Sequence, residues 1–416
     1  MTERAQDPNQ YPLLRNLQFS PLRQQDEQYI MLWDPSGIST DKLIIPLNYF
    51  FIIQHFDGEH SLEQVTTLYL KRFGEFLSPD RLSKLVADLN EKLFLEGERF
   101  AAAKAAAKAA YRDAPVRKAA YAGKSYPGDS TQLLAQLESF YSSKEGPEIR
   151  PSANRGKRMR GLVAPHHEMR DAGPLYAWAY KELKEAVAPN LVVVLGTCHA
   201  GLENLYALTD KDFETPLGLV RVDRDILDWF RKHGSSTYFD EELNHQYEHT
   251  IEFQLPFLQH TLGPDTPFTI VPILCAFPPA YVADPASQPV KDKIETFIQT
   301  MKEGIAASGK EPCIVASAEL AHIGMRYGDS DPPSDFTFHR CMQADLAMLK
   351  HVEEVDPEAF ARFILKEHDE RRIFGFAPIY TMLRLIQAAK GEVLRYDRAI
   401  TDQFNSTVTY ASMAFF

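Results

Sequence analysis

Short apolar runs alternate with longer amphipathic stretches through the larger, C-terminal part of the chain. The apolar runs lie at 160–164, 191–195, 268–274 and 313–318. They are rich in β-branched residues and lack polar alternation, which is typical of strands buried on both faces of a parallel sheet. Helical periodicity marks 131–141, 174–187, 223–233, 249–261, 290–307, 338–351, 357–367 and 378–389, and 408–414 has the pattern of a last strand. This order predicts an α/β domain with a largely parallel central sheet and helices on both faces.

The first part of the chain has a different pattern. A strand, a turn, a second apolar segment and a helix are predicted at 28–33, 34–37, 43–47 and 48–55. Two further helix starts are marked by the capping-box spacing of Ser61 and Gln64 and by Pro79 after Ser78. These elements predict a small α+β, winged-helix-like domain over residues 1–97.

An alanine-rich stretch, 101–110, separates the two patterns. Its composition strongly favours a helix, but it has no apolar stripe wide enough to pack against a core. We therefore expect a solvent-facing helical linker over 98–114, followed by a second domain over 115–416.

Composition and charge exclude several classes of function. The chain has 416 residues, 44% of them hydrophobic, and its net charge of −12 argues against a broad contact with nucleic acid or anionic lipid. No apolar stretch reaches the length of a membrane span, and the first residues lack the apolar core of a signal peptide, so a cytoplasmic protein is expected. The glycine-rich phosphate loops and the G-x-S-x-G motif are absent, so neither a nucleotide cofactor nor serine hydrolysis is expected.

Histidines follow three of the predicted strands. His166 and His199 come after two of the apolar runs, and His322 comes after a third. The carboxyl ends of parallel strands open onto the ligand crevice of such a sheet, so three imidazoles there predict a metal site or an acid/base site. A fourth histidine, His249, lies three residues before Glu252, and on a helix the two side chains would share a face.

Several segments of the second domain resemble the MEMO family, whose bacterial and archaeal members are called AmmeMemoRadiSam system protein B. The matching segments are Ala119 to Pro127, Ala164-Pro165-His166, Leu195 to His199, Glu248 to Glu252 with Leu255-Pro256, Val271 to Leu274 and Ser317 to Gly324. They occur in the order and spacing of the family and span residues 115–416. The first domain is similar, by pattern alone, to the small PqqD-like peptide-binding domains.

This resemblance implies a fold and a site. The MEMO family is similar to the LigB-type class III extradiol dioxygenases, in which two strand-end histidines and a carboxylate hold non-haem iron. In MEMO proteins two histidines and a cysteine form the matching pocket, with iron or copper as the metal. The two metal-binding histidines fall on His166 and His199, the acid/base histidine of the dioxygenases falls on His322, and the motif histidine of MEMO proteins falls on His249.

The chain departs from the family at the third ligand. Phe374 occupies the position of the family's cysteine and cannot bind a metal, and Glu319 replaces an aspartate. The residues that would substitute as a ligand are Glu319, Glu252, Glu168, His167 and Cys198. Glu319 ranks first among them, because it leaves the same strand end as His322. Cys275 and Cys313 lie in apolar, strand-like runs and have the pattern of packed thiols.

Two functions remain open from the sequence. In the first, His166 and His199 bind iron or copper, Glu319 or solvent completes the shell, and His322 acts as acid/base toward a small molecule in the cleft, oriented by His249. In the second, the protein is a non-catalytic binder that has reused a dioxygenase-like fold. Its first domain would then bind a peptide or a protein partner, and the family name implies radical-SAM and AMMECR1-like proteins.

Overall fold

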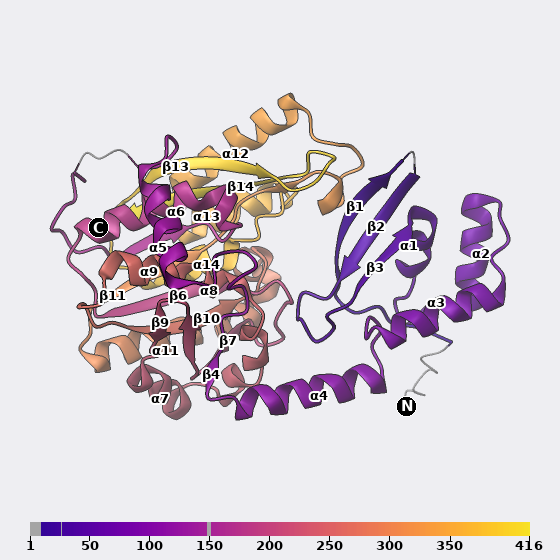
Figure 1. Ribbon diagram of the computed structural model, residues 1–416, viewed down its shortest axis with the longest axis horizontal. Helices are drawn as coiled ribbons and strands as arrows, with labels where there is room; N and C mark the ends of the chain where they lie inside the picture. The colour runs from indigo at the N-terminus through magenta and orange to yellow at the C-terminus, as the bar shows by residue number, and fades with distance from the viewer. Residues whose placement is uncertain (1–9, 26, 148–150) are drawn as a thin grey trace. The chain divides into compact units, whose positions relative to one another are not determined.

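The computed structural model describes residues 10–25, 27–147 and 151–416. The chain divides into two compact units, whose elements are labelled in Figure 1. The first unit extends to Ala114 and includes residues 402–404, and the second comprises 115–401 and 405–416. No helix among the described residues is long and apolar enough to cross a membrane.

The first unit combines a three-stranded antiparallel sheet with helices. Its elements are β1 Gln18–Gln24, β2 Glu27–Trp33, β3 Lys42–Pro46, α1 Leu47–Ile53, α2 Leu62–Phe73, α3 Pro79–Glu91 and α4 Glu98–Asp113, and the strand order is β1-β2-β3. The predicted capping box is present, since Gln64 N donates to Ser61 Oγ and Ser61 N donates to Gln64 Oε1. The pattern did not predict β1, where Pro21 and several polar residues interrupt the apolar alternation. The expected helix at 101–110 lies within α4.

A buried ion pair stabilises the first unit. Arg15 Nη1 lies 3.1 Å from Asp34 Oδ2 and also donates to the carbonyl of Leu93 at 2.6 Å. The guanidinium stacks over the ring of Phe100, 3.6 Å from its centroid. Because both charges are buried, each depends on the other for the interactions that water would otherwise supply.

The second unit is built on an eight-stranded mixed sheet. Four neighbouring strands at its centre are parallel, in the order β5 Gly161–Ala164, β11 Pro312–Ser317, β6 Leu191–Thr197 and β10 Thr269–Cys275. Antiparallel strands complete the two sides, namely β14 Thr407–Phe415 next to β5, β12 His322–Ile323 and β13 Gly391–Ile400 next to β14, and β7 Tyr206–Leu208 next to β10. A small separate sheet is formed by β4 Val116–Arg117, β8 Asp212–Thr215 and β9 Gly218–Val220.

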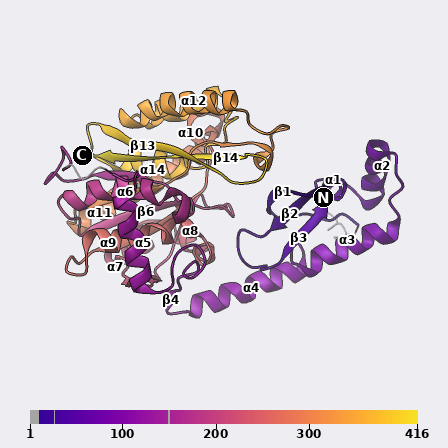
Figure 2. The same ribbon diagram turned by 45° about the horizontal axis from the view of Figure 1, so that its top comes forward.

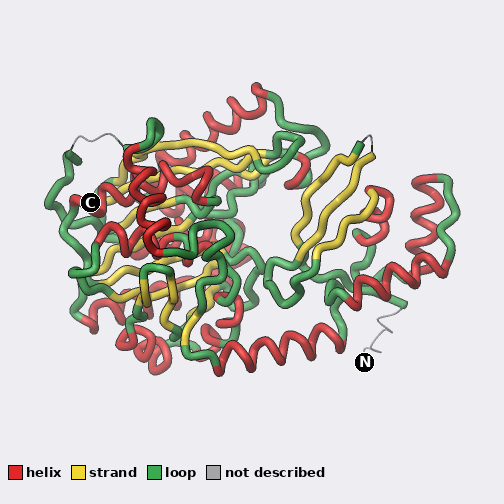
Figure 3. The backbone as a smooth tube through the Cα atoms, in the orientation of Figure 1, coloured by secondary structure: helices red, strands yellow, loops and turns green. Residues whose placement is uncertain are grey.

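Helices cover both faces of the central sheet, as predicted. The α-helices are α5 Ser130–Ser142, α6 Met169–Glu185, α7 Arg224–His233, α8 His249–Glu252, α9 Gln254–Leu262, α10 Ala280–Ala283, α11 Gln288–Ser308, α12 Asp335–Glu353, α13 Pro357–Lys366 and α14 Phe376–Leu385. Short 3-10 helices lie at Ser236–Phe239, Glu242–His245, Pro285–Ser287 and Met325–Tyr327. Every residue of β5 and β6 is buried, so neither face of these strands meets solvent. Figure 3 shows the strands of this unit enclosed between helices, and Figure 2 shows α12 running along β13 and β14.

The predicted helix over 249–261 is divided in two. Its first turn, α8, ends at Glu252, and α9 begins at Gln254. The physical reason is Pro256, which has no amide proton to donate to the carbonyl of Glu252. The strand β13 was not predicted either, because Arg395, Asp397 and Arg398 give it a polar sequence on a half-exposed edge. The fold class predicted from the sequence is nevertheless confirmed.

Candidate functional site

Two parallel strands carry the first two histidines to the same edge of the sheet. His166 follows the end of β5 by two residues, and His199 follows the end of β6 by two residues. The strand β11 lies between them, with Ser317 paired to Ala164 on one side and to Gly196 on the other. Because all three strands run in the same direction, both imidazoles leave the sheet at its carboxyl edge.

The first residue of α8, His249, joins these two. Close packing on β6 places it there: Thr250 Oγ1 donates to the carbonyl of Thr197 at 3.0 Å. A second anchor is Ser317, whose Oγ donates to the carbonyl of Thr250 at 2.6 Å. Gly196 permits this approach because it presents no side chain to α8.

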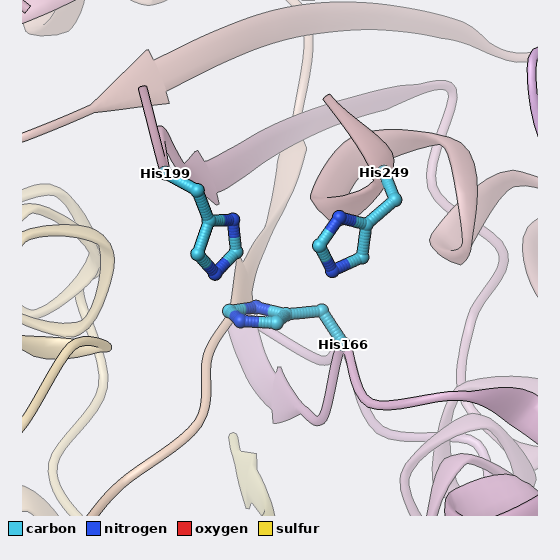
Figure 4. Close-up of side chains that lie close together, drawn as sticks. All are labelled: His166, His199 and His249. Atoms are coloured by element: carbon cyan, nitrogen blue, oxygen red, sulfur yellow. The ribbon is translucent and has the colours of Figure 1, made fainter. Parts of the chain in front are cut away.

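The rings of His166, His199 and His249 form one cluster. Their centroids are 5.3 Å apart for His166 and His199, 5.6 Å for His166 and His249, and 4.9 Å for His199 and His249. The rings of His199 and His249 are stacked on each other, and the ring of His166 lies edge-on to both (Figure 4). One nitrogen of each ring lies within 4.8 Å of one nitrogen of the other two.

His166 is the buried member of the cluster. Neither of its ring nitrogens has a hydrogen-bond partner among the described residues, although Nε2 lies 3.5 Å from Glu319 Oε2. Burial lowers the pKa of His166 and outweighs the opposite effect of the Glu319 carboxylate. The ring is therefore neutral at pH 7, and a buried nitrogen lone pair is left without a hydrogen-bond donor.

A carboxylate, Glu248, connects the other two histidines. Its Oε2 accepts from the backbone N–H of His199 at 2.8 Å, and its Oε1 accepts from that of His249 at 2.9 Å. The Nδ1 atoms of both rings also lie 3.1 Å from Oε1. Burial alone would raise the pKa of Glu248, but His199 and His249 outweigh it and hold this pKa well below its usual range. Burial lowers the pKa of His199, and the charge and hydrogen bond of Glu248 reverse this, so the net pKa is raised above 6.5.

The second carboxylate of the site is Glu319, two residues after the end of β11. Its Oε1 lies 2.7 Å from His167 Nδ1, and its Oε2 lies 3.1 Å from His322 Nε2. Burial would raise the pKa of Glu319, but the neighbouring histidines His166, His167 and His322 hold it well below its usual range. Glu319 is therefore the carboxylate that contacts His167 and His322, as Glu248 contacts His199 and His249.

The structure places His322 differently from the sequence prediction. This histidine does not follow β11 directly but lies in the separate strand β12, which is antiparallel to β14. The reason is that the backbone turns after β11, where Leu320 N donates to the carbonyl of Thr409. Its Nδ1 lies 3.0 Å from the carbonyl of Leu320, and its ring stacks on Phe374 with centroids 4.0 Å apart. One face of the His322 ring is therefore covered by the aromatic side chain of Phe374.

The expected pairing of His249 with Glu252 is wrong. Glu252 is fully buried and forms an ion pair with Arg117, and it also accepts from the backbone N–H of Tyr121 at 2.9 Å. The carboxylate partner of His249 is the preceding residue, Glu248. His249 and Glu252 are three residues apart in α8, but Glu252 pairs instead with Arg117 of β4. A hydrogen bond between a guanidinium and a carboxylate is stronger than one between neutral groups.

The remaining proposed substitute ligands lie outside the three-histidine cluster. Glu168 Oε1 accepts from Ser125 Oγ at 3.0 Å. Cys198 is buried, its Sγ lies 3.6 Å from the carbonyl of Gly201, and burial raises its pKa well above the ordinary value, so it remains a thiol. Glu248 was not predicted to be a site residue, although it stands directly before His249. Nothing local marks Arg117 as a site residue, since the partners that connect it to the site, in the segment 245–252, lie more than a hundred positions away in the chain.

The fold and the site together define an α/β protein with a histidine cluster at the carboxyl edge of its central sheet. The sequence profile of the family described as Memo-like protein matches residues 117–414. The chain therefore belongs to the Memo-like protein family. This confirms the relationship expected from the motifs.

Relatives within this family differ in how much of the chain they cover. A MEMO1 family protein of Ignicoccus hospitalis is 30% identical over 255 residues, which are 60% of this chain and 80% of that protein. One from Methanopyrus kandleri is 28% identical over 308 residues, 72% of this chain and 98% of its own. One from Aquifex aeolicus is 24% identical over 393 residues, 92% of this chain and 95% of its own, so its similarity extends into the first unit.

Proposed function

We propose that the second unit binds one divalent metal ion through His166, His199 and His249. The observation that supports this most directly is His166, whose two buried ring nitrogens have no hydrogen-bond partner among the described residues. An unpaired buried polar group is costly, and a metal ion bound to the lone pair would remove that cost. Three imidazole nitrogens are a donor set that suits iron, copper, nickel or zinc, and iron and copper are the ions that the family resemblance implies.

The proposal changes the role of His249 that the sequence suggested. Orientation of an acid/base group was expected of it, whereas its ring faces His166 and His199 closely enough to be the third ligand. In the family the third ligand is a cysteine, and here the corresponding residue is Phe374. A three-histidine set therefore compensates for that difference without any contribution from Glu319.

The groups around Glu319 supply a place to hold a proton. His322 Nδ1 faces the carbonyls of Leu320 and Arg372, and its Nε2 faces Glu319 Oε2. Carbonyls accept only, so Nδ1 carries a proton, and Nε2 lies 3.1 Å from Glu319 Oε2, close enough for the two atoms to share one further proton when it is taken up. We propose that this pair gives and takes that proton during turnover of a small molecule bound at the site, which is the acid/base role. Lewis-acid polarisation of an oxygen atom of that molecule is the chemistry that a bound ion supplies.

Calorimetric titration with Fe(II) without oxygen, and separately with Cu(II) and Zn(II), tests the metal site. The wild-type protein is expected to bind one ion, and His166→Ala, His199→Ala and His249→Ala are each expected to weaken binding by at least about tenfold. His339→Ala changes an exposed histidine of α12 and serves as the control, with unchanged affinity. Equal, weak binding by wild type and all variants would reject the proposal.

Metal affinity is expected to fall as the pH is lowered. Because the pKa of His199 is raised above 6.5, this ring holds a proton that the ion must displace at any pH below that pKa. Affinity should then decrease by about tenfold per pH unit below the pKa of His199 and level off above it, while His166, whose pKa is lowered, adds no dependence in that window. Titrations in buffers of different ionisation enthalpy measure the released proton. An affinity independent of pH from about pH 6 to about pH 9 would contradict the expectation.

A second candidate function is non-catalytic binding, and Phe374 is the observation that favours it. This ring is 42% exposed beside His322, so it presents apolar surface where the family has a metal ligand. In this case we propose a peptide or a protein partner of the AMMECR1-like or radical-SAM type. Sedimentation of the metal-free, full-length protein mixed with a purified AMMECR1-like protein tests it, and the absence of a complex at micromolar concentrations would count against that partner.

A further inference from the structure

Glu248 contacts two histidines of the cluster, His199 and His249, through both their backbone N–H groups and their rings. It accepts from the backbone N–H groups of His199, His249 and Thr250, the last at 3.3 Å. It also lies 3.1 Å from Nδ1 of both imidazole rings. One carboxylate thus holds the backbone and the ring of two histidines that are fifty positions apart in the chain.

The geometry restricts where the ring protons lie. Both oxygens of Glu248 accept backbone N–H groups, Oε2 from His199 and Oε1 from His249 and Thr250, so the carboxylate faces the two rings as a hydrogen-bond acceptor. Each Nδ1 that faces it must therefore carry a proton. In a neutral imidazole the other nitrogen, Nε2, is then a free acceptor.

The view of the cluster shows where those acceptors point. In Figure 4 the Nδ1 atoms of His199 and His249 face one another, and the two Nε2 atoms point toward the ring of His166. The side of each ring that binds Glu248 is therefore opposite to the side that faces the centre of the cluster.

We propose that Glu248 is a positioning residue that holds His199 and His249 as the tautomers with the proton on Nδ1, so that both Nε2 lone pairs face His166. The consequence for metal binding rests on the function proposed above, but the tautomers themselves do not depend on it. A carboxylate behind a histidine ligand is a general way to fix both the orientation and the basicity of the ring.

Long-range ¹H–¹⁵N NMR of the metal-free, full-length protein with ¹⁵N-labelled histidine tests the tautomers. Because the pKa of His199 is raised, its ring signals are first followed over a pH titration, and the spectra are recorded above the pH at which they stop changing, where the rings are neutral. His199→Gln and His249→Gln assign the signals. In the wild type both residues are expected to show a protonated Nδ1 and an unprotonated Nε2.

Substitution of Glu248 then tests the cause. Glu248→Ala is expected to release both rings into a mixture of tautomers and to weaken metal binding by about 10–100-fold. Glu248→Gln should have a smaller effect than Glu248→Ala, because its amide oxygen can still accept from both rings, which face the same oxygen in the wild type, while its NH₂ group can no longer accept from the backbone N–H of His199. Glu138→Ala is the matched control: Glu138 lies 3.1 Å from Nε2 of His260 at the surface, so only the signal of His260 should change.

The outcomes separate this inference from the function. Protonated Nε2 atoms in the wild type, or signals of His199 and His249 that do not change in Glu248→Ala, would overturn the inference. The wild-type spectrum decides the tautomers even if a variant fails to fold. Expected tautomers in a protein that binds none of the three ions would leave the positioning role intact and reject the metal site.

Discussion

Arg117→Met is expected to destabilise the second unit by about 3–5 kcal/mol, since it breaks a buried ion pair and leaves one charge behind. Arg117 and Glu252 are both fully buried. The guanidinium also donates to the carbonyls of His245 and Glu248, each at 2.9 Å. Its removal therefore leaves an unpaired carboxylate and two carbonyls without their donor.

This variant is also expected to weaken metal binding, because the carbonyl of Glu248 loses its anchor. Guanidinium unfolding followed by circular dichroism measures the stability, and hydrogen exchange over 245–252 localises the effect. Lys118→Met provides the control, since Lys118 pairs with Glu214 at an exposed position and should cost less than about 1 kcal/mol.

The double variant Arg117→Met/Glu252→Gln completes the cycle. It removes the unpaired charge, so it should be more stable than Arg117→Met alone. With Glu252→Gln measured as the second single variant, the loss of stability in the double variant minus the losses in the two single variants gives the coupling between the two side chains. Arg117→Met with wild-type stability would show that the pair does not hold this segment in place.

Gly196→Ala is expected to displace α8 from the sheet and to weaken the histidine cluster. A Cβ atom at Gly196 would lie 2.4 Å from Thr250 Oγ1 and 2.9 Å from Ile251 Cγ1. Atoms do not approach this closely, so the helix turn that begins with His249 must move. Overpacking of this kind typically costs about 1–3 kcal/mol, and metal affinity should fall with it.

Removal of the obstructing atom should reverse part of this effect. Thr250→Ala alone loses the hydrogen bond to Thr197 at a cost of about 1 kcal/mol. Gly196→Ala/Thr250→Ala is nevertheless expected to bind metal more tightly than Gly196→Ala, because the 2.4 Å contact is gone. Urea unfolding and calorimetric titration of the three variants check this, and unchanged metal affinity in Gly196→Ala would contradict it.

The central strands and the first two histidines of the site follow from sequence pattern. A strand covered on both faces has no polar alternation, so β5, β6, β10 and β11 are visible as short apolar runs. Their parallel direction implies that residues just after β5 and β6 meet at one edge. The proximity of His166 and His199 was therefore predictable, whereas metal binding by them stays a prediction.

Elements exposed to solvent on one side were harder to predict. The strand β13 contains the charged residues Glu392, Arg395, Asp397 and Arg398, and among the described strands it pairs with β14 alone. The division between α8 and α9 depends on one missing amide proton, at Pro256, within a stretch whose apolar periodicity continues. Periodicity reports which side chains are buried, and it does not report how the backbone hydrogen bonds are closed.

The sequence by itself determined the fold class, the family and the edge of the sheet where the chemistry gathers. Only the tertiary structure decided which groups pair there: Glu252 with Arg117, Glu248 with His199 and His249, and Glu319 with His167 and His322. The physical reason is range. Strand and helix patterns arise from neighbours within a few positions, but a buried charge is matched by whichever opposite charge or hydrogen-bond donor the fold brings within about 3 Å, however far away it lies in the chain.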